Sequence, residues 1–487
     1  MHTEVLIVGA GPTGLTLACD LARRSVRFRL LEQAPGLFPG SRGKGLQPRT
    51  QEVLDDLGVI GAVHSAGSRY PLMRSWQGAE PGPEWDLIER RPAEDGVPHP
   101  ELWMLPQWRT QEILHTRLVE LGGRVEFGTG VLAVRQDADG VEVDTAAGTA
   151  TADYLVAADG GRSTVRRAVG IPMAGETVDP MAALVADVRI EGLSRDNWHV
   201  WQHAPGGAAL LCPMPGGTAQ DFQLFAQYEE GEPDTSAEGV RRIVAERTPL
   251  PASAVTEVRW VSGFRPRAAL ADRFRLGRVF LAGDAAHVHS PAGGQGLNTG
   301  VQDAYNLGWK LGRVLRHGAP EALLDSYELE RLPVAADVLE ISTSLHRAGA
   351  IGVSAKRGAH TEQLGVGYRG GPLSDERRPG LAEDDLQAGD RAPDALCTDA
   401  DGSDIDGSGT DGGARRLFDV LRGPHATLVV AGRTLPVPAD LPAELRTARV
   451  EEGWGEGYLL VRPDGHIGLA TLDAADLGPY LAALGAA

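Results

Sequence analysis

The stretch VLIVGAGPTGLTLACDLARRSVRFRLLEQ, residues 5–33, contains the pattern that decides the fold. It begins with the apolar run Val5 to Val8, which is typical of a strand buried on both faces of a parallel sheet. The turn GAGPTG, residues 9–14, follows at G-x-G-x-x-G spacing, and its proline suits the first turn of a helix. Apolar and polar residues alternate over residues 26–31, which predicts a second strand. We therefore expect a strand-helix-strand unit at the start of the chain.

The glycine turn in this setting predicts a dinucleotide site. Gly9 makes the tight turn, Gly11 lets a pyrophosphate approach the backbone, and Gly14 lets the helix pack closely on the strand. Free N–H groups at the start of the helix attract the pyrophosphate. Glu32, directly after the second strand, is placed to accept hydrogen bonds from an adenosine ribose. The alternative is a structural turn that binds no ligand.

Two later segments indicate which dinucleotide is bound. Residues 155–166 read LVAADGGRSTVR, and residues 278–287 read RVFLAGDAAH. Asp284 ends a predicted strand beside the first motif, where its carboxylate suits a ribityl hydroxyl of FAD. Residues 291–298, PAGGQGLN, lead into the start of a predicted helix, which suits the negative charge of a reduced flavin. A plain flexible glycine loop is the alternative for this last segment.

Composition narrows the class of protein. A chain of 487 residues is expected to form two or three domains. The net charge of −19 argues against a nucleic-acid partner, because such binding relies on a basic face. The three cysteines, Cys19, Cys212 and Cys397, form no CxxC motif, so neither a disulfide framework nor a zinc site is supported. No apolar run is long enough for a signal peptide or a membrane helix, so we expect a cytoplasmic protein with no membrane partner.

The spacing of apolar residues predicts further helices and strands in the rest of the chain. Apolar residues recur at helical spacing in 109–121, 298–317 and 320–347, and short strands are predicted at 124–134, 140–145 and 153–158. Between about 175 and 275, strand-like stretches alternate with Pro/Gly turns, and one helix is predicted near 236–247. We take this region as a mostly antiparallel sheet, joined by the Trp- and Pro-rich segment 71–104. The tryptophans around this segment either line an aromatic pocket or pack under a loop: Trp76, Trp85, Trp103 and Trp108.

An Asp/Gly-rich segment, 398–413, separates the last predicted unit from the rest. Counting a calcium loop from Asp404 brings Arg415 to the position where a bidentate Glu is needed. Asp406, Ser408 and Gly409 match other positions of such a loop, but the missing Glu removes a required ligand. We therefore predict an exposed flexible loop. Beyond it, strands and helices alternate as in a small α/β unit.

The three motifs, in this order, closely resemble those of the FAD-dependent aromatic hydroxylases. These are single-component class A flavoprotein monooxygenases that include para-hydroxybenzoate hydroxylase and the hydroxylases of aromatic polyketide pathways. The resemblance covers about residues 1–350 and implies an α/β fold: a Rossmann-like FAD-binding domain interrupted by a mostly antiparallel substrate domain. The segment 460–465, LVRPDG, resembles a C-terminal thioredoxin-like α/β domain. Disulfide exchange is not expected there, because Cys397 is its only cysteine.

The resemblance also implies domain boundaries. The FAD-binding domain is expected to consist of three segments, 1–70, 105–174 and 275–345, and the substrate domain of 71–104 and 175–274. A linker at 346–390 and the thioredoxin-like domain at 391–487 complete the chain.

Roles carry over residue by residue onto the matching motifs. Arg42 and Lys44 match a basic segment that lies next to the flavin in the family; the alternative is an ordinary solvated loop. Gln107 matches a glutamine that contacts the flavin chain; the alternative is a polar residue at the start of a helix. No general base can be identified, so the catalytic residues stay unknown. His287 and His289 are interpreted as structural or flavin-adjacent. The full set of implied cofactor-binding residues is Gly9, Gly11, Thr13, Gly14, Glu32, Gln33, Arg42, Lys44, Gln107, Val131, Asp159, Arg166, Asp284, Gly296, Leu297 and Asn298.

The implied activity is hydroxylation of a phenolic or polycyclic polyketide-like aromatic compound through a flavin hydroperoxide. It uses non-covalently bound FAD, transient NADPH or NADH, and O2, in a monomer or homodimer. The alternatives are a Baeyer–Villiger outcome or an antibiotic-inactivating hydroxylation by the same chemistry, and a flavin-binding protein that assists partner enzymes without oxygenating anything. The absence of a second G-x-G-x-x-G argues against enzymes with two dinucleotide domains, and the Trp-x-Trp-x-Ile-Pro signature of flavin halogenases is absent.

Overall fold

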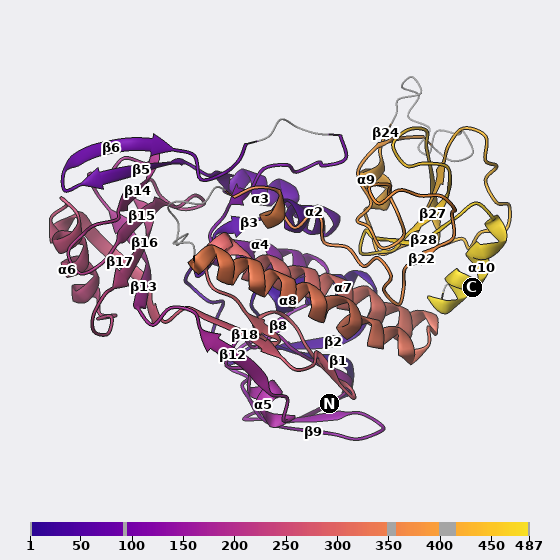
Figure 1. Ribbon diagram of the computed structural model, residues 1–487. Coiled ribbons are helices and arrows are strands. Elements are labelled where there is room, and N and C mark those ends of the chain that lie inside the picture. The colour runs from indigo at the N-terminus through magenta and orange to yellow at the C-terminus, as the bar shows by residue number, and fades with distance from the viewer. Residues whose placement is uncertain (1, 91–94, 348–356, 399–414, 486–487) are drawn as a thin grey trace.

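A computed structural model describes residues 2–90, 95–347, 357–398 and 415–485 (Figure 1). It opens with the expected unit: β1 (His2–Val8), α1 (Pro12–Arg23) and β2 (Phe28–Leu31). β1 pairs in parallel with β2 on one side and with β11 (Gly148–Ala157) on the other. Its apolar run is buried throughout, as a central strand requires.

This unit lies inside an eight-stranded sheet. Its main order is β19-β20-β11-β1-β2-β8, and β10 and β9 continue antiparallel from β11. The strands from β20 to β8 run parallel, which confirms the Rossmann-like core. The remaining bounds are β8 (Val125–Glu126), β9 (Val131–Gln136), β10 (Val141–Thr145), β19 (Arg275–Leu276) and β20 (Val279–Leu281).

Helices cover this sheet. α1 packs against α4 and α7, and Figure 1 shows α7 and α8 lying side by side across the middle of the molecule. Gly318 ends α7 in the left-handed conformation, with φ 70°. The helices of this part are α2 (Pro48–Asp56), α3 (Ile60–Ala66), α4 (Gln107–Glu120), α5 (Thr164–Ala168), α7 (Gly296–His317) and α8 (Asp325–Arg347), with short 3-10 turns at Gly283–Ala285, Ala292–Gly294 and Glu321–Leu324.

A separate seven-stranded sheet has the order β17-β13-β16-β15-β14-β5-β6. Neighbouring strands are antiparallel except β14 and β5, which pair in parallel. The mostly antiparallel sheet is thus confirmed, and strands from 71–104 form one edge of it. Its elements are β5 (Leu72–Gln77), β6 (Glu80–Trp85), β13 (Ala182–Ile190), β14 (Asn197–Trp201), β15 (Ala209–Pro213), β16 (Asp221–Tyr228), β17 (Val255–Phe264), α6 (Ala237–Arg247) and a 3-10 turn at Ala252–Ala254.

Two three-stranded sheets lie between the larger ones. One has the order β12-β18-β21, and the other β3-β7-β4. β3 belongs to the predicted basic segment, so its pairing fixes that segment against β7. Their bounds are β3 (Gly45–Leu46), β4 (Ser68–Arg69), β7 (Trp103–Met104), β12 (Met173–Thr177), β18 (Arg267–Ala271) and β21 (His287–Val288).

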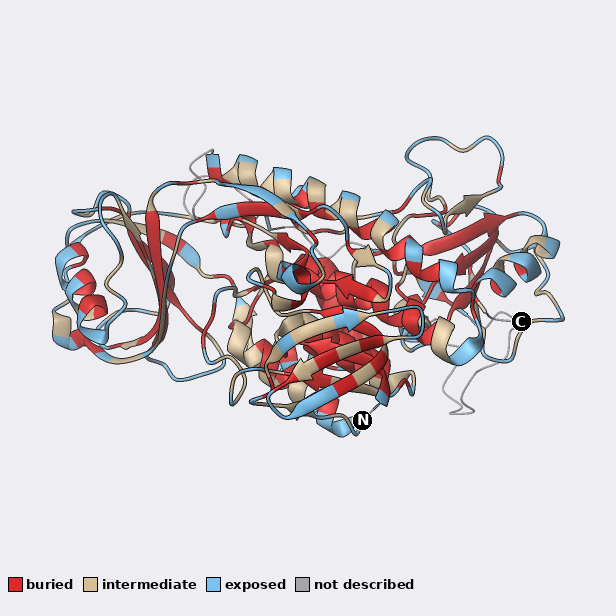
Figure 2. Cartoon of the chain, turned by 90° about the horizontal axis from the view of Figure 1, so that it is seen from below, coloured by how far each residue is buried: buried red, intermediate tan, exposed pale blue. Residues whose placement is uncertain are grey.

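The C-terminal unit has its own sheet, in the order β22-β28-β27-β25-β26. β25 is parallel to β26 and antiparallel to β27, the arrangement expected of a thioredoxin-like sheet. Figure 2 shows that the strands of this unit are buried, as are those of the central sheet. Its elements are β22 (Asp375–Glu376), β23 (Leu396–Cys397), β24 (Arg415–Arg416), β25 (Thr427–Ala431), β26 (Arg446–Val450), β27 (Gly457–Val461), β28 (Ile467–Thr471), α9 (Leu417–Leu421) and α10 (Leu477–Ala483), with 3-10 turns at Ala359–Thr361 and Ala474–Asp476.

The structure departs from the sequence expectation in several strands. The single strand expected over 124–134 is divided into β8 and β9, because Gly128 between them takes a φ of 67°. In the seven-stranded sheet and the C-terminal unit, the sequence predicts strands at 183–190, 208–212, 222–228, 256–264, 426–430, 457–461 and 466–470. It does not predict β14 or β26, because their polar residues interrupt the apolar pattern. The calcium-loop candidate at 404–414 lies outside the described residues, and within the described part of the chain no group of His, Cys, Asp or Glu residues is arranged to hold a metal. No helix of the described chain is long and apolar enough to cross a membrane.

Candidate functional site

The first glycine turn has two glycines required by packing and one that faces open space. A Cβ on Gly14 would lie 1.9 Å from the Gly9 carbonyl oxygen, and a Cβ on Gly9 would lie 2.3 Å from that of Ala158. A Cβ on Gly11 would meet nothing within 4 Å. Gly11 is the N-cap of α1, and no side chain caps the helix. The first N–H groups of α1 therefore remain available to an anionic group beside Gly11.

Glu32 holds this turn in place. Its carboxylate accepts hydrogen bonds from the Ala10 N–H and the Ala34 N–H, each at 2.8 Å. Each carboxylate oxygen keeps further acceptor capacity, so these bonds are compatible with binding a ribose. Neighbouring Gln33 is exposed, and Val131 is partly buried at the start of β9.

The second motif forms a capped turn before α5. The Asp159 carboxylate accepts hydrogen bonds from the Thr164 N–H at 2.7 Å and the Val165 N–H at 3.2 Å. Its other oxygen is buried and has no partner within the described residues, and burial raises the pKa of Asp159. A Cβ on Gly160 would meet nothing within 4 Å, so open space lies beside this turn.

Arg166 joins the second motif to the third. Its guanidinium donates to the Ala285 carbonyl at 2.9 Å and to the Gly161 carbonyl at 3.2 Å. The side chain is buried, which lowers its pKa. Arg166 therefore positions two loops rather than presenting an exposed cation.

The third motif places Asp284 in reach of solvent. Gly283 takes a φ of 60° in the turn after β20, and a Cβ there would lie 2.6 Å from the Thr13 hydroxyl oxygen. The Asp284 residue is exposed, but the protein groups around its carboxylate limit solvation and raise its pKa, an effect that His287 and Arg42 oppose. A Cβ on Gly296 would lie 3.9 Å from the Asp284 carboxylate, so the start of α7 is next to it.

Asn298 and Gln107 fix the basic segment against this loop. The Asn298 amide accepts from the Gln47 N–H at 2.8 Å and donates to the carbonyls of Gly45 and Gly294 at 2.9 and 2.7 Å. Gln107 accepts from the Arg42 N–H at 3.3 Å. The Arg42 side chain itself is exposed. A Cβ on Gly43 would lie 3.7 Å from Leu297, so Leu297 packs on the same segment.

These features fit FAD. The open space at Gly11 and Gly160, the unpartnered Asp159 oxygen, the accessible Asp284 and the exposed Arg42 lie on loops that the structure brings together. This donor and acceptor set suits a pyrophosphate joined to a polyol, and the uncapped start of the long helix α7 suits a ring that becomes negatively charged on reduction.

Lys44 turns away from these loops toward the seven-stranded sheet. Its ammonium donates to the Gln223 side-chain oxygen at 2.6 Å and lies 4.4 Å from the centre of the Trp198 ring. Gln223 in turn donates to the Ser41 carbonyl at 2.5 Å. The basic segment thus crosses from the glycine loops to the sheet. Neither Gln223 nor Trp198 carries a sequence motif, so pattern alone did not identify them.

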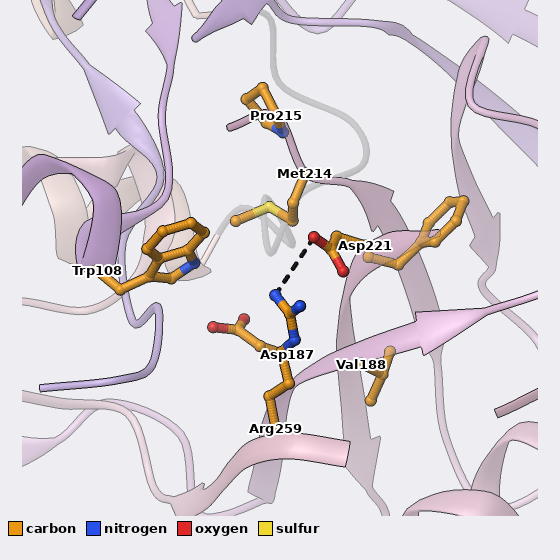
Figure 3. Close-up of a pocket in the computed structure, with 8 residues that line it drawn as sticks. Trp108, Asp187, Val188, Met214, Pro215, Asp221 and Arg259 are labelled. Carbon is orange, nitrogen blue, oxygen red and sulfur yellow. Dashed lines mark hydrogen bonds and ion pairs between the residues drawn. The ribbon is translucent and has the colours of Figure 1, made fainter. Parts of the chain in front are cut away.

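A narrow pocket lies beside this crossing (Figure 3). Trp108 comes from the start of α4, Asp187 from β13, and Met214 directly follows β15. One Asp187 oxygen is buried and has no hydrogen-bond partner within the described residues. Arg259 pairs with Asp221 at 3.3 Å on the other side of the pocket. Asp187 is a buried carboxyl group that the sequence did not single out.

We expect Asp187→Asn to stabilise the protein at alkaline pH. Burial raises the pKa of Asp187 from its ordinary value of 3.8 to about 6. Between these values the folded protein holds more protons than the unfolded chain, so stability falls as pH rises through this window. The ionised carboxylate then costs on the order of 3 kcal/mol, at about 1.4 kcal/mol per pKa unit.

Urea unfolding at about pH 8 and about pH 4 measures this effect. The variant gains stability over wild type at the higher pH only. Asp272→Asn, at an exposed site, is the control and gives the same difference at both pH values. An Asp187→Asn gain that does not depend on pH would contradict the assignment.

The two histidines form a buried chain behind the third motif. The Asp303 carboxylate lies 2.5 Å from His287 Nε2, and His287 Nδ1 lies 2.8 Å from His289 Nε2. Asp303 also accepts from the Gly283 N–H at 3.0 Å and from Arg331 at 2.8 Å. Although burial opposes it, His287 and Arg331 keep the pKa of Asp303 well below its usual range. This chain fixes the turn that carries Asp284.

A buried polar network connects this chain to the C-terminal unit. Glu330 of α8 accepts from Lys310 of α7 at 2.7 Å and from Arg462 of the C-terminal unit at 2.6 Å. The three side chains have no solvent exposure. Tyr368 accepts from Arg331, the partner of Asp303, at 3.1 Å. The C-terminal unit is thereby joined to the helices that carry the third motif.

Of the four tryptophans singled out in the sequence, three pack against neighbouring side chains and one lines a pocket. Trp76 donates to His199 at 3.0 Å and stacks with Trp201 within the seven-stranded sheet. Trp103 packs against His64, with ring centres 4.9 Å apart. Trp85 packs beside a buried apolar cluster of the seven-stranded sheet, and Trp108 lines the pocket beside the crossing.

Comparison with known proteins agrees with this geometry. Residues 2–342 match the family model described as an FAD binding domain. A flavin-dependent monooxygenase of Mycobacteroides abscessus is 46% identical, over 98% of this chain and 99% of the relative. The 12-dehydrotetracycline 5-monooxygenase/anhydrotetracycline 6-monooxygenase of Streptomyces rimosus is 35% identical, over 96% and 95%. A crystal structure of aklavinone-11 hydroxylase with FAD and aklavinone superposes with a TM-score of 0.79 at 28% identity, covering 99% of this chain and 98% of the other.

Proposed function

The chain belongs to the FAD-dependent aromatic monooxygenases, and from this premise we propose that it hydroxylates a polycyclic phenolic compound of polyketide type. The electron donor is NADPH or NADH, and the oxidant is O2. The observation that carries the proposal is the crossing at Lys44, where the loops that fit FAD meet an aromatic wall of the seven-stranded sheet. Relatives that act on tetracycline intermediates and bind aklavinone support the substrate class.

The proposed cofactor site uses the residues that converge on the open glycine loops. Bound FAD supplies the electron transfer from the nicotinamide and the activation of O2. The chain supplies the anion-binding start of α1, the Glu32 and Asp284 carboxylates as acceptors, and Arg42 as an exposed cation. The rest of the proposed set orders these groups: Gly9, Gly11, Thr13, Gly14, Gln33, Gln107, Val131, Asp159, Arg166, Gly296, Leu297 and Asn298.

The substrate is proposed to lie between these loops and the seven-stranded sheet. The aromatic rings and apolar side chains there exclude water, which protects an oxygenating site from wasteful side reactions. We assign the seven-stranded sheet to substrate binding and the C-terminal unit to structural support. The proposed boundaries are those expected from the sequence, except that β22, within the expected linker, joins the sheet of the C-terminal unit. The protein is proposed to act as a monomer or homodimer.

Activity measurements test the proposal directly. Purified protein is expected to be yellow and to oxidise NADPH or NADH faster when a suitable polycyclic phenol is present. Mass spectrometry of the product should show one added oxygen atom, and NMR should show a new phenol rather than a ring-expanded lactone. Flavin-containing protein that no aromatic compound stimulates would contradict the proposal and favour a non-oxygenating role.

We expect Asp284→Ala to be purified largely without FAD. A hydrogen bond to a charged group contributes about 1.5–3 kcal/mol, so the Kd for FAD should rise about tenfold or more. Asp272→Ala removes the same charge from an exposed site and serves as the control. Titration of apoprotein with FAD, followed by flavin fluorescence, measures both values. Equal Kd values for the two variants would show that Asp284 does not bind the cofactor.

A further inference from the structure

The segment 361–363 packs against the first turns of α7, the helix whose start suits the flavin ring. Gln363 lies at the end of this segment and is only 5% exposed. Its backbone takes a φ of 62°, in the left-handed region that residues other than glycine rarely adopt. Such a conformation persists only where the surrounding structure holds the residue firmly.

The Gln363 amide is fully bonded to residues at the start of α7. Its nitrogen donates to the Gln295 side-chain oxygen at 2.7 Å and to the Thr299 hydroxyl oxygen at 3.0 Å. Its oxygen accepts from the Gln302 side-chain nitrogen at 2.6 Å. The Thr299 hydroxyl donates its own hydrogen to the Gln295 carbonyl at 3.1 Å, so it can only accept from Gln363. All three partners are buried, and they fix the orientation of the amide.

The segment is also held from its other side. The Arg49 N–H of α2 donates to the Glu362 carbonyl at 3.4 Å. His466 of the C-terminal unit has its Nε2 atom 3.3 Å from the Val366 carbonyl oxygen, and its ring centre 4.4 Å from that of Tyr368. Gln363 is therefore clamped between α7 on one side and α2 with the C-terminal unit on the other.

Gln295 occupies the N-cap position of α7, but its side chain does not cap the helix. Its amide nitrogen donates instead to the carbonyls of Gly293 and Thr361, each at 3.0 Å, and its oxygen accepts from Gln363. The Gln295 amide is thus engaged with the segment 361–363 and the preceding turn. The first N–H groups of α7, which have no partner within the helix, are left without a cap from this residue.

Loss of the Gln363 amide would free the Gln295 side chain. Its oxygen would then be buried without a donor, which is unfavourable. The N–H groups at the start of its own helix are donors that lack an intrahelical partner. A released Gln295 oxygen would accept from them and would compete with any anion bound at the start of α7.

We propose that Gln363 is a positioning residue for the flavin. It keeps the Gln295 side chain off the start of α7, so that the free N–H groups and the positive end of the helix face the ring of reduced FAD. This inference rests on the proposed function, which assigns FAD to the loop before α7. Because the oxidised ring is neutral and the reduced ring carries negative charge, the effect of Gln363 falls on the reduced form.

The midpoint potential of bound FAD tests this inference. Gln363→Met keeps much of the side-chain volume but has no amide. Its affinity for reduced FAD, relative to oxidised FAD, should fall about tenfold, which lowers the potential of a two-electron couple by about 30 mV. The potential is measured in FAD-loaded protein without substrate, by slow reduction in the presence of a reference dye. A purely structural role would weaken the binding of both forms alike and leave the potential unchanged.

Further variants locate the effect. Gln363→Gly removes the amide and the backbone strain together and should show the same lower potential, so it keeps the test decisive if Gln363→Met does not fold. Ser25→Gly relieves the same kind of strain, at a φ of 58° on an exposed residue, and is the matched control with the wild-type potential. Gln295→Ala should have little effect alone, and in the double variant with Gln363→Met it should restore most of the lost potential.

The outcomes separate this inference from the proposed function. Potentials of both Gln363 variants within about 10 mV of wild type, which is about twofold in affinity, would overturn the inference. A double variant with a potential no higher than that of Gln363→Met would also overturn it. Wild-type protein that binds no FAD would contradict the proposed function and the inference together. The expected shifts in a protein that hydroxylates no aromatic compound would contradict the proposed function alone.

Discussion

Gly14→Ala is expected to yield protein that contains almost no FAD and is less stable than wild type by about 3 kcal/mol, the upper part of the range for overpacked sites. The added Cβ would lie 1.9 Å from the Gly9 carbonyl oxygen, which belongs to the backbone and cannot rotate away. Relief requires α1 to move off β1. That movement opens the turn whose N–H groups face the open space at Gly11.

Gly61→Ala is the matched control for this prediction. Gly61 lies in α3, where a Cβ would meet nothing within 4 Å, so alanine should be neutral or stabilising by up to about 1 kcal/mol. Thermal melting and the ratio of flavin to protein absorbance measure both variants. A Gly14→Ala protein with the flavin content and melting temperature of Gly61→Ala would show that close packing of α1 on β1 is not required.

Glu330→Ala should lower the free energy of unfolding by about 3–5 kcal/mol, because it leaves two buried cations without their shared partner. Glu330 accepts from Arg462 at 2.6 Å and from Lys310 at 2.7 Å, and none of the three side chains is exposed to solvent. The loss arises mainly from the buried charge of Lys310, which is left with the Asn306 side-chain oxygen, whereas Arg462 keeps its pair with Asp464.

Denaturant unfolding measures this loss. Glu232→Ala breaks the pair with Arg265 on the surface, where both side chains are largely exposed, and should cost less than about 1 kcal/mol. Because the network connects α8 to the C-terminal unit, Glu330→Ala should also allow that unit to unfold before the FAD-binding core. A loss no greater than that of Glu232→Ala would mean that water reaches the network.

The sequence predicted those parts of the site that depend on local backbone geometry. The turn at 9–14 was identified because glycine is required there by contacts within a few residues and across one strand, and those contacts are present. The fold class followed from the same unit, since a buried strand followed by such a turn and a helix specifies a parallel sheet.

The side chains at the crossing between the glycine loops and the seven-stranded sheet could not be predicted in this way. Lys44, Gln223 and Trp198 meet across segments that are far apart in the sequence, and no spacing rule relates them. Asp187 lies in β13, where it is as buried as the apolar residues on either side of it, so no local sequence pattern indicates a functional carboxyl group there. For Lys44 the resemblance predicts a position beside the flavin, and the folded chain adds the contacts of its ammonium with Trp198 and Gln223, which the sequence does not predict.

The strand order of the central sheet has a consequence for synthesis on the ribosome. β1 and β2 emerge first, but β1 pairs on its other side with β11, and β11 with β20, which follows only after the seven-stranded sheet has been made. The nascent chain therefore carries an unsatisfied apolar edge through most of translation, a state that favours aggregation and chaperone capture. Slow elongation before β20 should lower the yield of native protein more than the same delay after α8.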